Sequence, residues 1–499
     1  MNIKRAKEEI INTVKAYLSC DENGNYKIAA VRQRPILLMG PPGVGKTQIM
    51  EQVAEECSIA LVAYTITHHT RQSAVGLPFI VKKKYKDKDY SVTDYSMSEI
   101  IASVYEKQER TGFTQGILFI DEINCVSETL APTMLQFLQY KTFGNQKVPD
   151  GWIIIAAGNP PEYNKSVREF DAVTLDRVRK IEVEPDFEIF KEYAYKQDIH
   201  PSILQYLDIR RENFYRFETT PDGTFFATAR GWEDLSEMLT VCEELHIPVD
   251  AEFVYEYIQH DRIAKDFSNY YELYNKYKKE YKIEEIVQGA YSENLIKSLK
   301  IAPFDERLNL TGLLLGRLGR SFVDTENSEK YTEMLYEALK EYLAQLPLSE
   351  TRPDLLLKEM IERKETELTH RKQEGLINRK EEACKLRALT TLKKYQEVLR
   401  TEKETSLKTS DTIKGLFEED REKRMKRIEK TSLELDNAFL FMEKAFGEGQ
   451  EMVIFITELS VNYYSAQFIA NHGCKKYYEY NKSLLFGEKQ EEIIRNVEK

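Results

Sequence analysis

The first 184 residues of the chain alternate short apolar runs with amphipathic stretches. Helix-like segments separate most of the apolar runs, and this alternation is typical of β–α–β units. The pattern therefore predicts a doubly wound, mainly parallel sheet with helices on its faces. Its expected strands are residues 35–39, 58–66, 116–120 and 152–158, with a weaker one at 179–184.

One segment interrupts this alternation. Residues 79–95 place β-prone flanks on either side of the polar stretch "KDKD". This pattern predicts a hairpin inserted into the core, directly before a helix at residues 98–110.

Beyond the last of these strands the apolar pattern becomes helical. Residues 185–282 predict helices rich in Tyr and Phe without strands, and residues 283–350 predict a further helical region. Residues 351–445 are highly charged and predict a long solvated helix or a helical hairpin with its tip at 401–412. Residues 446–499 predict buried C-terminal helices.

Composition narrows the classes of protein that the chain can represent. It has 499 residues, a net charge of −12 and six scattered cysteines, which favour reduced thiols in a cytoplasmic protein. The acidic balance argues against non-specific nucleic-acid binding, which needs a basic surface. The N-terminal stretch contains acidic residues and no apolar run reaches the length of a membrane span, so we expect neither a signal peptide nor membrane insertion.

The stretch "GPPGVGKT" at residues 40–47 fits the pattern G-x-x-x-x-G-K-[ST] between a predicted strand and a predicted helix. Its glycines permit a tight loop whose N–H groups point at phosphate oxygens, and the helix N-terminus adds positive potential. We expect Lys46 to reach the β- and γ-phosphates and the Thr47 hydroxyl to bind Mg²⁺. The predicted nucleotide-binding residues are Gly40, Pro41, Pro42, Gly43, Val44, Gly45, Lys46, Thr47 and Gln48.

Two carboxylates, Asp121 and Glu122, end the strand at residues 116–120. Burying an unpaired charge is costly, so a core strand that ends in two acids needs a cation or solvent there. Ligands of such sheets bind at the carboxyl ends of the strands, beside the phosphate loop. We therefore expect Asp121 to support Mg²⁺ and Glu122 to polarise an attacking water.

Three further polar residues occur behind these two motifs. Asn159 ends the next apolar strand, Arg177 follows a short helical stretch, and Arg230 opens a helix of the second region. Alone, Asn159 is compatible with a turn and each arginine with the surface. Their order and spacing behind the two motifs favour roles at the phosphates.

Over about residues 5–245 the chain resembles the AAA+ ATPases, and within them the MoxR family. The resemblance is carried by "PILLMGPPGVGKT", "ILFIDEIN", "VPDGWIIIAAGNPP" and "LDR", with "GLP" after the second strand. It implies an α/β P-loop AAA+ core at residues 1–184, an α-helical lid at 185–282 and an all-α C-terminal region. The hairpin at 79–95 would be the insert that this clade carries in its second helix.

The resemblance also implies roles for the three polar residues. Asn159 would be sensor 1, Arg177 the arginine finger and Arg230 the sensor 2 arginine of the lid. The family usually has an aromatic residue directly after the finger, whereas Val178 and then Arg179 follow here. Arg179 therefore stays an alternative finger.

As a MoxR-like protein, the chain would form a hexameric ring that binds ATP and Mg²⁺ and remodels or matures a client protein. Such ATPases often work with a partner that carries a von Willebrand factor A domain, whose metal motif is D-x-S-x-S, and we expect this partner in a separate chain. An alternative is a GTP- or ATP-driven motor linked to nucleic acid and working with a nuclease subunit, which the basic stretches at 81–88 and 421–427 keep open. A non-hydrolysing nucleotide switch is a third interpretation, against which Glu122 argues.

Overall fold

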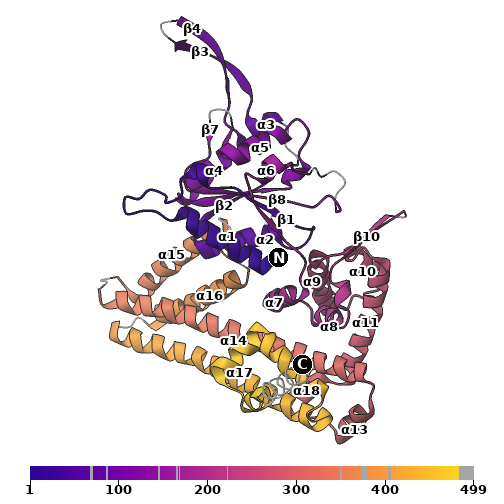
Figure 1. Cartoon of the computed structure of the whole chain (residues 1–499). Coiled ribbons are helices and arrows are strands. Elements are labelled where there is room, and N and C mark those ends of the chain that lie inside the picture. The colour runs from indigo at the N-terminus through magenta and orange to yellow at the C-terminus, as the bar shows by residue number, and fades with distance from the viewer. Residues whose placement is uncertain are drawn as a thin grey trace. The chain divides into compact units, whose positions relative to one another are not determined.

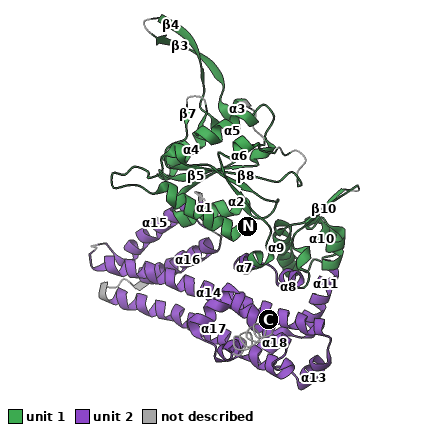
Figure 2. Cartoon of the chain, in the orientation of Figure 1, with its two compact units in different colours: residues 1–191, 209–267 green, residues 192–208, 268–499 purple. Residues whose placement is uncertain are grey.

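The structure is a computed structural model of the 499-residue chain. It describes all residues except 68–70, 86–87, 144–145, 164–166, 168, 222, 349–350, 374–376, 378, 403–405 and 483–499. Contacts divide the chain into two compact units (Figure 2). Unit 1 comprises Met1–Lys191 and Ile209–Phe267, and unit 2 comprises Glu192–Asp208 and Ser268–Lys499. The finer domain boundaries expected from the sequence stay predictions.

Unit 1 contains a five-stranded sheet in which every pairing is parallel. Its strand order is β2-β5-β8-β1-β9, with bounds Ala60–Thr65, Gly116–Asp121, Trp152–Gly158, Ile36–Met39 and Arg179–Glu182. All five strands lie where the apolar runs predicted them, so the predicted α/β core is confirmed. In the register of the sheet, Met39 pairs with Gly158, which brings the carboxyl ends of β1 and β8 level.

Helices cover both faces of this sheet. Helices α1 and α2 pack on one face and α4 and α5 on the other; their bounds are Ile3–Leu18, Lys46–Cys57, Glu99–Thr111 and Ala131–Tyr140. Successive residues of β1 face opposite ways: Leu37 joins the core of α4 and α5, whereas Ile36 and Leu38 join that of α1 and α2. Because both faces are covered, the strands are continuously apolar rather than alternating.

The predicted hairpin is also present. Strands β3 (Pro78–Tyr85) and β4 (Lys88–Tyr95) pair antiparallel as a separate two-stranded sheet, and Figure 1 shows this hairpin extending away from the core. A shorter hairpin of β6 (Thr142–Phe143) and β7 (Gln146–Lys147) was not predicted. The remaining short helices of the core are η1 Ala30–Arg32, α3 Arg71–Val75, η2 Ile123–Cys125 and α6 Ala172–Leu175.

The prediction that residues 185–282 contain no strands is wrong. Strands β10 (Arg216–Thr220) and β11 (Gly223–Ala227) form an antiparallel hairpin in unit 1. Aromatic residues and threonines flank the sequence "PDG", in which Gly223 has a positive φ of 145°. This is a local hairpin signal that the helical periodicity around it obscured. The other elements of this region are α7 Phe187–Gln197, η3 Arg211–Asn213, α9 Ala229–Leu245, α10 Ala251–Tyr257 and α11 Asp261–Glu280.

The described part of unit 2 is entirely helical, as predicted (Figure 2). Its elements are α8 Pro201–Ile209, α12 Ile283–Val287, α13 Glu293–Ile301, α14 Phe304–Gln345, η4 Leu346–Leu348, α15 Pro353–Gln373, α16 Arg379–Glu402, α17 Ser406–Phe446, α18 Gln450–Val461 and α19 Tyr463–His472. In the described part of the chain, no helix is long and apolar enough to cross a membrane.

The charged segment of unit 2 is neither one solvated helix nor a single hairpin. It forms α15, α16 and nearly all of α17, so the sequence analysis missed the break between α15 and α16. Residues 403–405 of the predicted tip lie outside the described residues, and α17 already begins at Ser406. The three helices share one core with α14, which includes Leu357, Leu392 and Ile413. Three to four apolar residues per two turns are enough to bury such a helix on one side.

Two glycines of α14 allow a second helix of unit 2 to approach closely. A Cβ atom at Gly316 would lie 2.8 Å from Cβ of Pro201, the first residue of α8, and one at Gly312 would overlap the side chain of Gln205. By contrast, a Cβ at Gly319 would meet nothing within 4 Å. The backbone of α14 therefore lies directly against α8 at Gly312 and Gly316.

These two environments predict opposite effects of the same substitution. Gly319→Ala should raise the free energy of unfolding by about 0.5–1 kcal/mol, because alanine favours the helix and no atom obstructs it. Gly316→Ala gains the same propensity but pushes against the rigid Pro201 ring, which should cost about 1–3 kcal/mol. Chemical denaturation of both variants checks this, and a Gly316→Ala variant as stable as Gly319→Ala contradicts the close packing.

Candidate functional site

The loop between β1 and α2 closes tightly at the carboxyl end of β1. Its Gly40 N–H donates to the carbonyl of Gly158, 3.3 Å away, at the end of β8. Gly43 and Gly45 have φ values of 73° and 87°, in the left-handed region that favours glycine. Gly45 is the N-cap of α2, so the loop ends with backbone N–H groups at a helix N-terminus.

Lys46 lies buried inside this loop, with 8% of its surface exposed. Its Nζ donates three hydrogen bonds, to the carbonyl oxygens of Gly40 (2.8 Å) and Pro41 (2.9 Å) and to Oδ1 of Asn159 (2.8 Å). Burial lowers the pKa of Lys46 to about 8, although the nearby Asp121 carboxylate opposes the shift. The ammonium group is therefore desolvated and held by three protein oxygens.

The predicted metal ligands meet beside Lys46. The Thr47 hydroxyl donates to Oδ2 of Asp121 over 2.8 Å, and the other oxygen of Asp121 accepts from the N–H of Glu122. Hydroxyl and carboxylate oxygens are the ligands that Mg²⁺ prefers, so the donor set fits this ion. The described residues contain no group of three or more His, Cys, Asp or Glu that could hold a metal. Mg²⁺ bound to nucleotides takes most of its ligands from phosphates and water.

Glu122 stands at a sharp turn after β5. Its backbone has a φ of 57°, a left-handed conformation that is uncommon for a residue with a side chain. The turn is closed by the N–H of Cys125, which donates to the Glu122 carbonyl at 2.8 Å. Among the described residues, none donates a hydrogen bond to the Glu122 carboxylate, which is half-buried. The turn thus separates the carboxylate of Glu122 from that of Asp121.

Asn159 joins the site through both its side chain and its backbone. Its side chain accepts from Lys46, and its carbonyl oxygen accepts from Nδ2 of Asn124 at 2.8 Å. The sequence analysis missed Asn124, although a polar residue in the apolar stretch after Asp121 and Glu122 was a possible signal.

Residues 209–267 of unit 1 also reach the loop. The Tyr215 hydroxyl donates to the carbonyl of Pro42 at 2.9 Å, and a Cβ at Gly43 would lie 2.9 Å from Cβ of Thr228. Thr228 caps α9 by accepting from Gly231, and Arg230 lies exposed in the first turn of this helix. The charge of Arg230 lowers the pKa of Lys46, which places Arg230 within electrostatic reach of the loop.

The two candidate finger arginines lie apart from this group. Arg177 is exposed, and its Nη1 donates to Oε1 of Gln139 at 2.6 Å. Arg179 belongs to β9 and binds α1, through the Glu9 carboxylate at 2.6 Å and the Thr13 hydroxyl. Neither guanidinium donates a hydrogen bond to residues 40–48, Asp121 or Glu122, all of which the structure describes.

The pattern D-x-S-x-S occurs once in the chain, as "DYSMS" at residues 94–98. The structure does not arrange these side chains as metal ligands. Asp94 pairs with Lys83 at 2.9 Å, Ser96 Oγ accepts from the N–H of Leu77, and Ser98 Oγ donates to the carbonyl of Ala74. These contacts fix the base of the hairpin and the start of α4.

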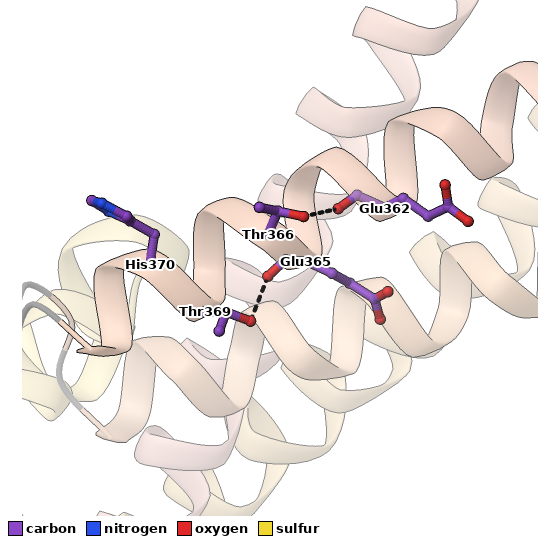
Figure 3. A pocket seen from close by; sticks show the side chains of 5 residues that line it. All are labelled: Glu362, Glu365, Thr366, Thr369 and His370. Atoms are coloured by element: carbon purple, nitrogen blue, oxygen red, sulfur yellow. Dashed lines mark hydrogen bonds between the residues drawn. The ribbon is translucent and has the colours of Figure 1, made fainter.

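Two surface depressions in the described part of unit 2 lack a comparable group of polar side chains. One lies on α15 and is lined by Glu362, Glu365, Thr366, Thr369 and His370 (Figure 3). Both threonine hydroxyls donate to carbonyls of their own helix at 2.8 Å, so they are occupied. The other surrounds Arg317, whose guanidinium is paired with Glu284 and Glu434.

Comparison with known proteins agrees with this geometry. Residues 35–178 match the AAA domain family, dynein-related subfamily. This part of the chain has the fold of an AAA domain. The AAA domain includes every predicted site residue except Arg230. No curated protein matches the chain. A solved structure, a candidate ATPase from Cytophaga hutchinsonii, shares 15% identity with a TM-score of 0.24. That match covers 39% of this chain and 50% of the other, so only half of that protein is spanned.

The lowered pKa of Lys46 in the AAA domain predicts a pH-dependent stability. Below about pH 8 the folded chain carries the buried charge, whereas only well above pH 10.5 is the group neutral in both states. The unfolded state therefore binds more protons between these values, and stability rises with pH. Relative to Lys46→Met, the wild type should gain about 2 kcal/mol of unfolding free energy between about pH 7.5 and 9.5.

Denaturation of both proteins at each pH measures this difference. The comparison with Lys46→Met removes the contributions of all other titrating groups. A difference that stays constant over the range contradicts a desolvated ammonium group at Lys46.

Proposed function

We propose that the chain is a Mg²⁺-dependent AAA+ ATPase of the MoxR type. It works in the cytoplasm as a hexameric ring that remodels or matures a client protein, together with a separate von Willebrand factor A domain partner. The observation that carries the ATPase proposal is the buried Lys46 ammonium beside the Thr47–Asp121 hydrogen bond. The match of residues 35–178 to the AAA domain supports it.

Nucleotide phosphates fit the loop because they replace weaker acceptors. The two neutral carbonyls and the Asn159 amide now hold Lys46, and a phosphate oxygen with its negative charge is a stronger acceptor than any of them. The backbone N–H groups of residues 43–47 supply further donors at the N-terminus of α2. Binding therefore transfers Lys46 from protein oxygens to the β- and γ-phosphates.

The remaining residues of the site have separate roles in the proposed hydrolysis. Thr47 and Asp121 would hold Mg²⁺, which neutralises charge on the β- and γ-phosphates when it is bound. Glu122 accepts the proton of the attacking water, and Asn159 hydrogen-bonds the water or the γ-phosphate. Arg230 adds positive charge from the first turn of α9.

The surface charges favour a protein client over nucleic acid. Four basic residues of the stretch 421–427 are paired with acids; the pairs are Arg421–Glu418, Lys423–Asp420, Lys426–Glu422 and Arg427–Asp324. These ion pairs reduce the positive charge that the stretch offers to a phosphate backbone. The alternative is a motor that works with a nuclease subunit. Assays of nuclease activity with candidate partners, and competition of GTP with ATP for the site, test this alternative.

The decisive test of the ATPase proposal is Glu122→Gln. Glutamine keeps the size and hydrogen bonding of the side chain but cannot accept the proton, so turnover should fall about 10²–10⁴-fold. Binding of ATP and Mg²⁺ should persist, because Lys46, Thr47 and Asp121 are unchanged. Asp121→Asn is the matched control, and it should instead raise the Mg²⁺ concentration needed for half-maximal activity. Turnover of Glu122→Gln near the wild-type value contradicts the role of Glu122.

The arginine finger should be Arg177, acting on a neighbouring subunit. A head-to-tail ring presents different surfaces to its two neighbours, so one subunit can complete the site of the next. The Arg177 guanidinium is exposed, whereas Arg179 is held by Glu9 of its own chain. Arg177→Ala should bind ATP and barely hydrolyse it. Arg179→Ala should keep its turnover and lose at most about 1 kcal/mol of stability.

Mixing two inactive variants tests whether the site is shared. Arg177→Ala retains an intact pocket and Lys46→Ala retains an intact finger, so about a quarter of interfaces in an equal mixture combine both intact parts. ATPase activity should then exceed that of either variant alone. Mixed rings seen by native mass spectrometry without any recovered activity contradict the proposal, and full activity of Arg177→Ala would transfer the role to Arg179.

The β3–β4 hairpin should contact the client or partner. Its apolar side chains are open to solvent; Ile80 is 77%, Tyr85 54% and Tyr90 50% exposed. Replacing residues 81–92 by a short turn should preserve basal ATPase activity and abolish stimulation by the partner, because the hairpin is a separate sheet. Loss of folding in this variant contradicts that independence. Two double variants compare the two faces of the hairpin in the same measurement of stimulation by the partner. Tyr85→Ser/Tyr90→Ser changes one face, and Lys82→Ser/Lys84→Ser changes the other.

A further inference from the structure

Asn124 lies inside the proposed site, yet none of the roles above uses it. Its side chain is 1% exposed, and Nδ2 donates to the Asn159 carbonyl at 2.8 Å. Its Oδ1 atom is buried and has no hydrogen-bond partner among the described residues. Burying an acceptor without a partner destabilises a protein, and an apolar side chain of the same shape would avoid that cost. A role in packing alone therefore does not account for this asparagine.

The end of β8 holds the Asn124 amide in place. A Cβ atom at Gly158 would lie 2.8 Å from Cγ of Asn124 and would overlap its Oδ1. Any side chain at residue 158 would therefore displace the amide. Gly158 directly precedes Asn159, so Asn124 packs against one residue and hydrogen-bonds the next.

Asn124 also belongs to the turn that carries Glu122. It is the middle residue of η2, which follows the left-handed Glu122 and is closed by the hydrogen bond from Cys125 to the Glu122 carbonyl. The bond from Asn124 to Asn159 thus connects the turn of the proposed base to the end of the neighbouring strand. Asn159 in turn accepts from Lys46 through its side chain.

We propose that Asn124 is a positioning residue for ATP hydrolysis, which rests on the function proposed above. Its hydrogen bond to the Asn159 carbonyl fixes the Asn159 amide relative to the Glu122 carboxylate. In this proposal Asn124 acts only through Asn159. Misplacing a reacting or orienting group slows chemistry more than it weakens binding.

Asn124→Leu tests this in the full-length protein, because leucine keeps the branched shape and the number of heavy atoms and removes the amide. The kcat for ATP should fall about tenfold, whereas the Kd for ADP by titration calorimetry should change less than about twofold, since Lys46 and the loop are intact. A kcat equal to that of the wild type, or a parallel loss of ADP affinity, overturns the proposal.

A double-mutant cycle separates positioning from independent effects. Because Asn124 acts through Asn159, Asn124→Leu/Asn159→Ala should be no slower than Asn159→Ala alone. Rate losses that multiply would show that Asn124 works independently of Asn159 and would overturn the proposal. Gly158→Ala offers a second route if Asn124→Leu does not fold: displacing the amide should lower kcat and leave the Kd for ADP unchanged.

The wild-type control distinguishes this inference from the function on which it rests. A wild-type protein that does not hydrolyse ATP contradicts the proposed ATPase and leaves the cycle without a reference rate. A wild type that turns over ATP, with an unaffected Asn124→Leu variant, contradicts the role of Asn124 alone.

Discussion

The buried ammonium group of Lys46 is the interaction on which the site depends. A cation without water needs several oxygen acceptors, and the chain supplies them from the phosphate loop and from the end of β8. This requirement joins two neighbouring strands of the parallel sheet, since β1 leads into the loop and Asn159 follows β8. It also keeps the site ready for an anion, because the bonds that hold Lys46 are ones that a phosphate can replace.

The same loop links the AAA domain to the rest of unit 1. Thr228 packs against Gly43, and Tyr215 donates to the carbonyl of Pro42. Both contacts are made to the loop backbone, so any change in loop conformation would alter the support of α9 and of Tyr215, which directly precedes β10. The proposed ATPase thereby gains a physical route from the phosphates to residues 209–267, without any further contact with the nucleotide.

The strands and the phosphate loop could be predicted because their signals are local. Continuous apolar runs follow from a sheet covered on both faces, and the loop needs glycine and lysine at fixed spacing. The β10–β11 hairpin was missed because its short alternation lies between strongly helical segments. The break between α15 and α16 was missed because strongly charged runs flank it, although the uncharged "GLIN" at residues 375–378 contains Gly and Asn, which favour a break. Asn124 was missed because its role depends on a partner 35 residues away, which spacing does not reveal.

The two candidate finger arginines, Arg177 and Arg179, show what the tertiary structure adds to the sequence motif. By sequence, Arg177 and Arg179 are equivalent basic residues on either side of Val178. Val178 is buried at 5% exposure, and a side chain that turns into the core directs the flanking residues outward. Pairing β9 with β1 then carries Arg179 to α1, where Glu9 and Thr13 engage its guanidinium. Arg177 precedes the strand, and among the described residues its guanidinium donates a hydrogen bond to the half-buried Gln139 of α5, an interaction that a phosphate can outcompete. The proposal of Arg177 over Arg179 therefore depends on where β9 begins.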